Sequence, residues 1–282
     1  MNIGIRLHDT APGSFEERLR FAKAQGFSCV HVALSKTVPG FSMTEAPKRL
    51  ADPAFAERVR TALEETQLQC AVLGCYLSLV SPDPQKVAQT QEIYKAHLRF
   101  STKIGAAVVG TEAPAGENAV FATPYTESEE ALNCFIESLR PLVRCAEEEN
   151  AVIAIEPVYR HIVSTPERMQ RVLEAVPSDH LQVILDAVNL IGPSRVHEAD
   201  AIIDDAIARL GDRVRVLHMK DFRLSDDGSE VLSMACGLGH MHYEHLLRFG
   251  AELPMTLEDT RPENAEASRL LLERIGGELS RV

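Results

Sequence analysis

The chain has 282 residues, of which 45% are hydrophobic and 25% are charged, and its formal net charge is −12. This length suits one large α/β domain or two small ones. The acidic balance argues against a nucleic-acid partner, which requires a surplus of Lys and Arg on one face, but it allows a small anionic substrate that a few local cations hold.

Strands and helices alternate along the sequence from its first residues onward. Short apolar runs predict eight strands, and turn or helix signals separate them. The predicted strands are residues 2–6, 28–34, 68–73, 106–109, 152–156, 181–186, 214–218 and 254–258.

The segments between these strands carry helix signals. Ser14 and Glu17 have the spacing of a capping box, and Thr165 followed by Pro166 is typical of a helix start. Pro141 lies inside a long helical segment, where it favours a kink or a break. The helices predicted after the first one cover residues 53–66, 85–104, 127–150, 197–210 and 263–275.

Eight strands that alternate with helices favour a (β/α)8 (TIM) barrel, and we expect residues 1–282 to form a single domain of this kind. The alternative is a doubly wound open sheet, but no G-x-G-x-x-G sequence follows the first strand. The connections from strand to helix are long and polar, as at the active-site face of a barrel. Residues 36–52 are predicted to be a polar loop, and residues 223–236 are predicted to form a hairpin.

Four polar side chains end four successive predicted strands. Their spacing of roughly 30 to 40 residues is that of one strand–helix–strand unit, so in a barrel they meet on one face. Three carboxylates and an imidazole would be stabilised there by a divalent cation, and this donor set suits Mn²⁺, Mg²⁺, Co²⁺ or Zn²⁺. For any one of them the alternative is a solvated strand end. The four residues are Glu156, Asp186, His218 and Glu258.

Five short motifs resemble those of the xylose-isomerase-like superfamily of sugar-phosphate isomerases and epimerases: AIEPV, VILDAVNL, LHMKD, CGLGH and LPMTLED. The resemblance covers nearly the whole chain and implies a divalent cation bound by Glu156, Asp186, His218 and Glu258. It also implies that Glu156 and Glu258 are the acid and base that move a proton beside a carbonyl, through a metal-stabilised enediolate. The substrate it implies is a small sugar-like molecule, and barrels of this kind often form homodimers.

Two departures from the superfamily pattern bear on which of its branches the chain resembles. Ketose 3-epimerases often have a histidine three residues after the strand-six aspartate, where this chain has Asn189. An amide does not change charge near neutral pH, so Asn189 weakens an assignment to the tagatose-epimerase type. The DNA-repair endonuclease branch carries D-x-H after the seventh strand. That motif is missing here, and together with the acidic charge this excludes the branch.

Five further residues are candidates for substrate binding, and each has a structural alternative. Glu112 follows the fourth strand at the height of a sugar hydroxyl. The side chain of Arg223 could hold a phosphate or carboxylate, or form a surface ion pair. Lys220 points the same way as His218 and either contacts substrate or forms a salt bridge inside the barrel. The five residues are Glu112, His161, Asn189, Lys220 and Arg223.

Three functions remain open from the sequence. The favoured one is a metal-dependent isomerase or epimerase of a sugar, a sugar phosphate or a related polyol. The second is a dehydratase of the inosose or dehydroshikimate type, which begins with the same proton abstraction but then expels a hydroxyl. The third is a barrel that binds a sugar-like ligand without turnover, which an intact ligand set disfavours.

The cysteines and the N-terminus bear on the compartment. The six cysteines form no C-x-x-C pair, and several lie in apolar runs, so we expect buried reduced thiols in a cytoplasmic protein. The first ten residues carry no signal-peptide pattern. No apolar stretch reaches the roughly 18 residues of a membrane span, so no membrane partner is expected.

Overall fold

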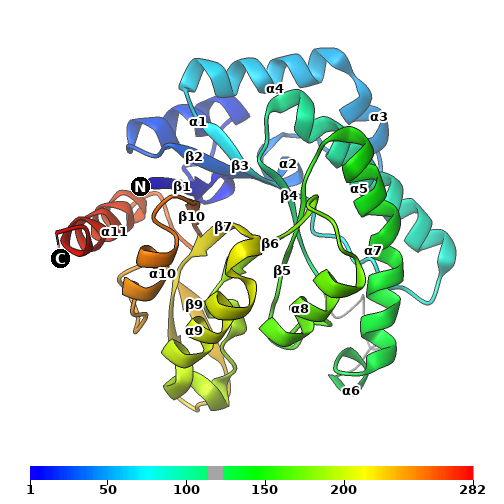
Figure 1. Cartoon of the computed structure of the whole chain (residues 1–282). Coiled ribbons are helices and arrows are strands. Elements are labelled where there is room, and N and C mark those ends of the chain that lie inside the picture. Colours follow the sequence, from blue (N-terminus) through cyan, green and yellow to red (C-terminus); the bar gives the residue numbers. More distant parts are fainter. Residues whose placement is uncertain (114–122, 282) are drawn as a thin grey trace.

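Eight parallel strands close into a barrel in the computed structural model, which describes residues 1–113 and 123–281 (Figure 1). The strand order around the barrel is β1-β10-β7-β6-β5-β4-β3-β2. The predicted (β/α)8 barrel is therefore confirmed. The strands are β1 (Asn2–Arg6), β2 (Cys29–Val32), β3 (Gln69–Gly74), β4 (Val108–Glu112), β5 (Ile153–Glu156), β6 (Leu181–Asp186), β7 (Val214–Met219) and β10 (Pro254–Leu257).

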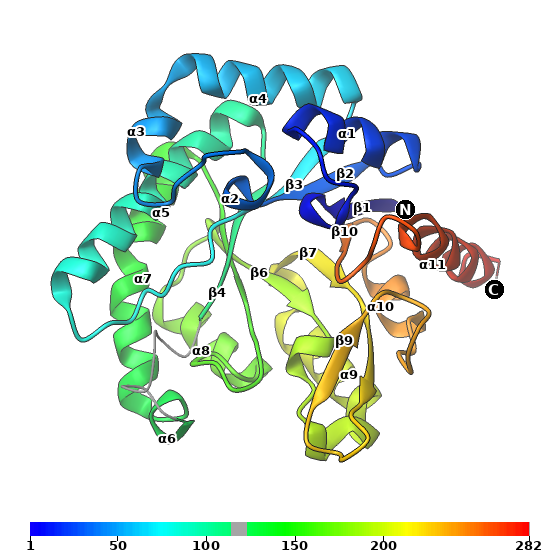
Figure 2. The same ribbon diagram turned by 180° about the vertical axis from the view of Figure 1, so that it is seen from behind.

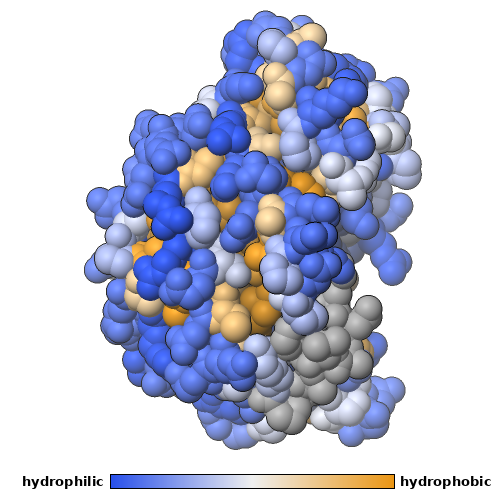
Figure 3. All heavy atoms as spheres, turned by 90° about the vertical axis from the view of Figure 1, so that its right-hand side faces the viewer, coloured by the Kyte–Doolittle hydropathy of each residue, from blue (hydrophilic) through white to orange (hydrophobic). Residues whose placement is uncertain are grey.

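Helices surround the barrel on its outside (Figures 1 and 2). Their outer surfaces are mostly hydrophilic on the side that carries α5 and α7, and hydrophobic residues show mainly in the furrows there (Figure 3). The helices are α1 (Phe15–Ala24), α2 (Leu34–Thr37), α3 (Ala46–Ala51), α4 (Pro53–Thr66), α5 (Pro84–Ile104), α6 (Thr123–Thr126), α7 (Glu129–Glu149), α8 (Pro166–Ala175), α9 (Ala199–Leu210), α10 (Glu244–Phe249) and α11 (Ala265–Leu279). No helix in the described part of the chain combines the length and apolar character needed to cross a membrane.

Capping residues set several helix starts. The Ser14 hydroxyl accepts a hydrogen bond from the backbone of Glu17, whose carboxylate accepts one from the Ser14 backbone, so the predicted capping box is confirmed. The Thr165 hydroxyl caps α8 by accepting a hydrogen bond from the Arg168 backbone, and Pro166 lies in the first turn. Of the kink or break predicted at Pro141, the break is wrong, because α7 continues through that residue. The predicted polar loop at 36–52 is also wrong in part, since α2 and α3 occupy much of it.

An antiparallel hairpin leaves the barrel directly after β7. It consists of β8 (Asp221–Leu224) and β9 (Val231–Met234), and it confirms the hairpin predicted for residues 223–236. The hairpin stands beside the barrel mouth on the side of α9 (Figure 2).

Small side chains fill the barrel interior. One buried cluster contains Cys29, Ala71, Val108, Ala154 and Val216, each from a different strand. Alternate residues of a strand face the same side. The residues two positions further along β2, β5 and β7, which stand at or near the strand ends, must therefore also point inward.

Gly4 shows how tightly this interior is packed. A methyl group on Gly4 would lie 2.3 Å from the Cys29 carbonyl oxygen, so we expect Gly4→Ala to lower the free energy of unfolding by about 3 kcal/mol. Gly277→Ala in α11 is the matched control. Outside the backbone of α11 itself, no atom of the described residues lies within 4 Å of its added methyl group, and helix propensity predicts a gain of up to about 1 kcal/mol. Urea unfolding of both variants measures the difference, and equal stabilities would contradict this packing.

All six cysteines are free thiols, and only Cys134 of α7 is exposed. Burial raises the pKa of Cys29 and of Cys70 to about 12. The expectation of buried reduced thiols is therefore confirmed for five of the six.

Candidate metal centre and active site

Polar side chains gather inside the barrel at the carboxyl ends of the strands. Each stands two residues beyond a residue of the interior packing layer on its own strand, and the alternation of strand residues therefore turns it inward. Glu258 directly follows β10, in step with Thr256. The group consists of Arg6, His31, Glu156, Asp186, His218 and Glu258, and all but Arg6 are buried.

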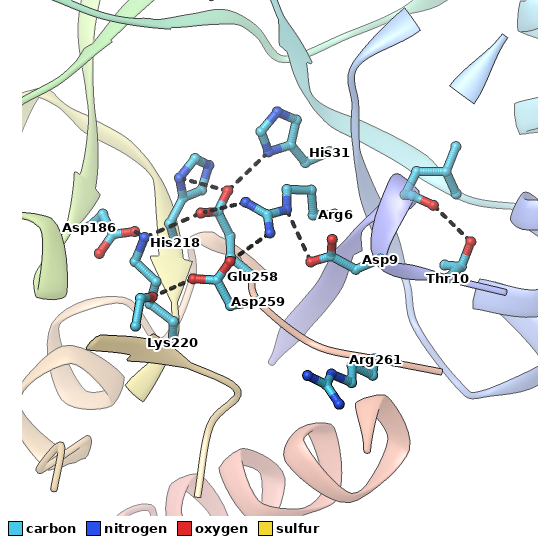
Figure 4. A network of polar contacts seen from close by, with 12 residues as sticks. Arg6, Asp9, Thr10, His31, Asp186, His218, Lys220, Glu258, Asp259 and Arg261 are labelled. Carbon is cyan, nitrogen blue, oxygen red and sulfur yellow. Dashed lines mark hydrogen bonds and ion pairs between the residues drawn. The ribbon is translucent and has the colours of Figure 1, made fainter. Parts of the chain in front are cut away.

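His218 lies at the centre of this group. Its Nδ1 is 3.1 Å from Glu156 Oε2 and 3.3 Å from Glu258 Oε1. His31 approaches the same oxygen of Glu258, with its Nδ1 at 3.4 Å, and the His31 ring stacks on the His218 ring (Figure 4). The two glutamates predicted to act as acid and base are thus both in contact with one imidazole nitrogen.

Asp186 faces a buried lysine. Lys220 Nζ is 2.9 Å from Asp186 Oδ2 and 3.5 Å from Glu258 Oε2. Lys220 therefore forms a salt bridge inside the barrel, which is one of the two roles predicted for it. Asn189 forms hydrogen bonds with two of the carboxylates. Its side-chain amide donates to Glu156 Oε1 at 2.5 Å, and its backbone N–H donates to Asp186 Oδ1 at 3.1 Å.

The chemistry of these residues fits a divalent cation. Two triads have ligand atoms within 4.8 Å of one another: Glu156, Asp186 and His218, and His31, His218 and Glu258. His218 Nε2 is buried without a hydrogen-bond partner in the described structure, whereas His218 Nδ1 and Asp186 Oδ2 have only the ion-pair contacts with Glu156, Glu258 and Lys220 given above. Buried polar atoms are normally paired, and carboxylate oxygens with an imidazole nitrogen are donors that divalent cations accept.

The charges in the group act on one another. Burial opposes protonation of His218, but the carboxylates of Glu258 and Glu156 outweigh it and raise its pKa to about 9. Burial raises the pKa of Asp186 to about 6 although Lys220 opposes it. Burial alone would raise the pKa of Glu258 too, but His218 and the other cations around it hold that pKa well below its usual range.

Binding of a divalent cation to the metal-free protein should release a proton near neutral pH. With a pKa of about 9, His218 is protonated at pH 7, whereas an imidazole must be neutral to bind a metal. The apparent affinity for Mn²⁺ should therefore rise about tenfold per pH unit between pH 7 and 8.5. Calorimetric titration in two buffers of different ionisation enthalpy measures the release.

The surface histidine His242 offers the control. Its pKa is also raised, through a hydrogen bond with Asp200, but it lies outside the cluster, so His242→Gln should release the same number of protons. Metal binding that is independent of pH over this range would show that His218 is already neutral.

A cavity of about 320 Å³ opens beside the cluster. Both Glu156 and Glu258 line it, together with Glu112. Burial and the neighbouring Glu156 raise the pKa of Glu112 to about 8, and His161 Nδ1 lies 3.4 Å from its Oε2. Of the predicted site residues, Glu112 therefore lines the same cavity as Glu156 and Glu258, and His161 contacts Glu112.

Two predicted residues do not line this main cavity. Arg223 is exposed on β8, outside the lining of the main cavity. Asn189 lines a second cavity of about 220 Å³, between the hairpin and the loops after β5 and β6. Arg160, in the left-handed region at φ 68°, lines that second cavity and lies over the Tyr159 ring.

Sequence reasoning missed three residues of the site. His31 interrupts the apolar strand β2 two residues after the inward Cys29, which is the signal that could have identified it. Tyr76 follows β3, and its hydroxyl lies 3.2 Å from His31 Nε2. Arg6 ends β1 and contacts Glu258 at 3.4 Å and Asp259 at 2.8 Å (Figure 4).

Asp221, next to Lys220, holds the loop that follows the hairpin. Its carboxylate is buried and accepts five hydrogen bonds. The backbone N–H groups of Gly237 and Gly239 are among the donors, so both glycines are bound to this side chain. The donors are the backbone N–H groups of Phe222, Gly237, Gly239 and Met241 and the hydroxyl of Tyr243.

A closed parallel barrel with a buried group of carboxylates and imidazoles at its carboxyl end defines a TIM barrel with a candidate metal centre. The family model that matches the sequence, over residues 19–275, is the xylose isomerase-like TIM barrel. The chain belongs to this family. A search of the curated proteins found no match.

Solved structures share the fold along nearly the whole chain. The 3-keto-D-glucoside 4-epimerase of E. coli is 17% identical and aligns over 97% of this chain and 99% of that chain, with a TM-score of 0.74. The IolI protein with a bound zinc atom is 16% identical over 99% and 98%, with a TM-score of 0.71. A probable 3-DHS dehydratase of Bacillus anthracis is 15% identical over 98% and 97%, with a TM-score of 0.70. At these identities the likeness establishes the fold.

Proposed function

We propose that the protein is a divalent-metal-dependent isomerase or epimerase of a sugar or sugar phosphate. The observation that carries this proposal is the placement of two buried glutamates, Glu156 and Glu258, at one imidazole and at the wall of one cavity. An acid and a base on the same reacting carbon require this kind of arrangement. The epimerase among the structures of the same fold supports it.

Glu156, Asp186, His218 and Glu258 would hold the cation. Bound there, it would act as a Lewis acid on the carbonyl and hydroxyl oxygens of the substrate and stabilise the enediolate. One of the two glutamates removes the proton beside the carbonyl, and the other returns a proton. Asn189 holds the Glu156 carboxylate in place through its amide, and Lys220 does the same for Asp186.

Solvent deuterium exchange tests the proposal. Purified protein is analysed for bound metal, stripped with a chelator and reloaded with Mn²⁺, Mg²⁺, Co²⁺ or Zn²⁺. Each form is incubated in D₂O with ketoses with and without a phosphate group. We expect deuterium to enter the carbon beside the carbonyl only in the metal-loaded forms. Exchange that persists after complete metal removal, or no exchange into any ketose, would refute the proposal.

A dehydratase is the second candidate, and one observation favours it. Expulsion of a hydroxyl needs an acid in the cavity, and burial keeps the pKa of Glu112 at about 8, so that it holds a proton at pH 7. The mass of the product separates the two functions, because only a dehydratase yields a product lighter by one water. In that case Glu112→Gln should stop water loss while deuterium exchange continues.

A further inference from the structure

Two opposing walls of the main cavity carry different charges. The wall from β4 and β5 presents the carboxyl groups of Glu112 and Glu156. The segments after β1 and β2, which lie across the barrel from β5 in the strand order, present His8, Ser35 and Lys36. The cavity is therefore acidic at Glu112, Glu156 and Glu258, and it carries the positive charge of Lys36 on the side of α2.

The two strong cations of the lining differ in how they are used. Arg6 is paired with three carboxylates, at 3.0 Å from Asp9, 3.4 Å from Glu258 and 2.8 Å from Asp259. Lys36 is exposed and forms no ion pair in the part of the chain that the structure describes. Lys36 is thus the cation of the cavity whose charge is available to a ligand.

Two neutral groups stand beside Lys36. Ser35 is exposed at the cavity wall and offers a hydroxyl. His8 lines the same wall, and its Nδ1 is buried without a hydrogen-bond partner in the described residues. Burial lowers the pKa of His8 to about 4, so that the ring is neutral and can donate one N–H. Lysine, hydroxyl and imidazole N–H are all donors, and an anionic oxygen is the acceptor that suits such a group.

The position of α2 sets which part of a ligand these donors reach. Lys36 comes four residues after Val32, the last residue of β2, whereas His31 on the strand itself lies against Glu258. A ligand whose reacting carbon lies between Glu156 and Glu258 would extend from the cluster towards α2. A cavity of about 320 Å³ accommodates a six-carbon sugar with one substituent.

We propose that Lys36, with Ser35 and His8, binds a carboxylate or phosphate on the substrate at the end remote from the reacting carbon. The site thereby selects acidic sugars or sugar phosphates over neutral sugars. The identity of the reacting end rests on the proposed function, but the anion subsite itself does not. In a protein of net charge −12, an anionic substrate needs such a local cation to offset repulsion by the acidic surroundings.

Three ketoses that differ only at C6 test the subsite: D-fructose with a hydroxyl, D-fructuronate with a carboxylate and D-fructose 6-phosphate with a phosphate. Binding to the Mn²⁺-loaded full chain is measured by calorimetry, which needs no turnover. We expect one or both anionic ketoses to bind about tenfold more tightly than D-fructose. Preference for one of the two anions identifies the group that the subsite takes.

Variants assign the preference to Lys36. Lys36→Gln should remove the tenfold preference and leave the affinity for D-fructose unchanged, and Lys36→Arg should restore it. Lys103→Gln, at the far end of the barrel on α5, is the matched control and should behave as wild type. Equal binding of the three ketoses, no binding of either anionic ketose, or a preference that survives in Lys36→Gln would each overturn the subsite.

The outcome is separable from that of the proposed function. If no ketose exchanges deuterium but the anionic ketoses still bind more tightly through Lys36, the subsite stands and the isomerase assignment fails. If exchange occurs in neutral and anionic ketoses alike with equal affinities, the isomerase assignment stands and the subsite fails.

Discussion

Replacing Glu258 or Glu156 with glutamine is expected to lower the rate of solvent deuterium exchange by about 10²–10⁴-fold. Glutamine has nearly the same shape as glutamate, but it cannot accept a proton at neutral pH. In Glu156→Gln the side-chain oxygen can still accept the hydrogen bond from Asn189, so the loss reports proton transfer more than geometry. The exchange rate is followed by NMR at saturating metal.

Metal binding must be measured on the same variants, because both glutamates contact His218 and are proposed ligands. We expect weaker cation affinity in each, and the exchange rate should stay low when added metal restores full occupancy. Glu112→Gln is the matched control at the same cavity wall, and its effect on exchange should be below about tenfold. Wild-type exchange in either metal-saturated glutamine variant would remove the acid and base assignment.

Replacing Asp221 with alanine is expected to lower the free energy of unfolding by about 4 kcal/mol. The carboxylate is 1% exposed and accepts five hydrogen bonds. Its removal leaves several buried N–H groups without an acceptor, and each unsatisfied donor costs roughly 1–3 kcal/mol before water or local rearrangement relieves it. Urea unfolding followed by circular dichroism gives the difference.

Asp221→Asn separates charge from hydrogen bonding. It keeps one acceptor oxygen but turns an NH₂ group towards N–H donors, so its loss of stability should be close to that of alanine. Asp226→Ala at the exposed hairpin tip is the control, and it should change stability by less than about 0.5 kcal/mol. An Asp221→Ala variant that unfolds at the same urea concentration as wild type would show that the loop does not depend on this carboxylate.

The sequence was sufficient to predict the barrel and to predict that four polar side chains meet at the carboxyl ends of its strands. Four residues stand at or next to the end of a strand of clear apolar pattern, and alternation along parallel strands brings such positions together. They are Glu156, Asp186, His218 and Glu258. Glu112 was placed less accurately, because β4 runs to that residue and pairs it directly with Glu156, whereas the strand was predicted to end three residues earlier.

Contacts between segments that lie far apart in the chain could not be predicted from local sequence patterns. His31 was overlooked because the second strand was predicted to run through residue 34, which put His31 in the strand interior, whereas β2 ends at Val32 and α2 follows at once. Nothing local indicates that Asp221 binds a loop up to 22 residues away. Arg223 was predicted to bind substrate, and only the outward course of β8 shows that its side chain is exposed.

The distribution of thiols makes this protein suitable for optical studies without prior removal of cysteines. A maleimide reagent attacks accessible thiolates, and of the six cysteines only Cys134 is exposed. A fluorophore coupled to the native chain should therefore attach at one position, on the exposed surface of α7. Such a label would report tumbling or self-association by anisotropy while leaving the interior chemistry untouched.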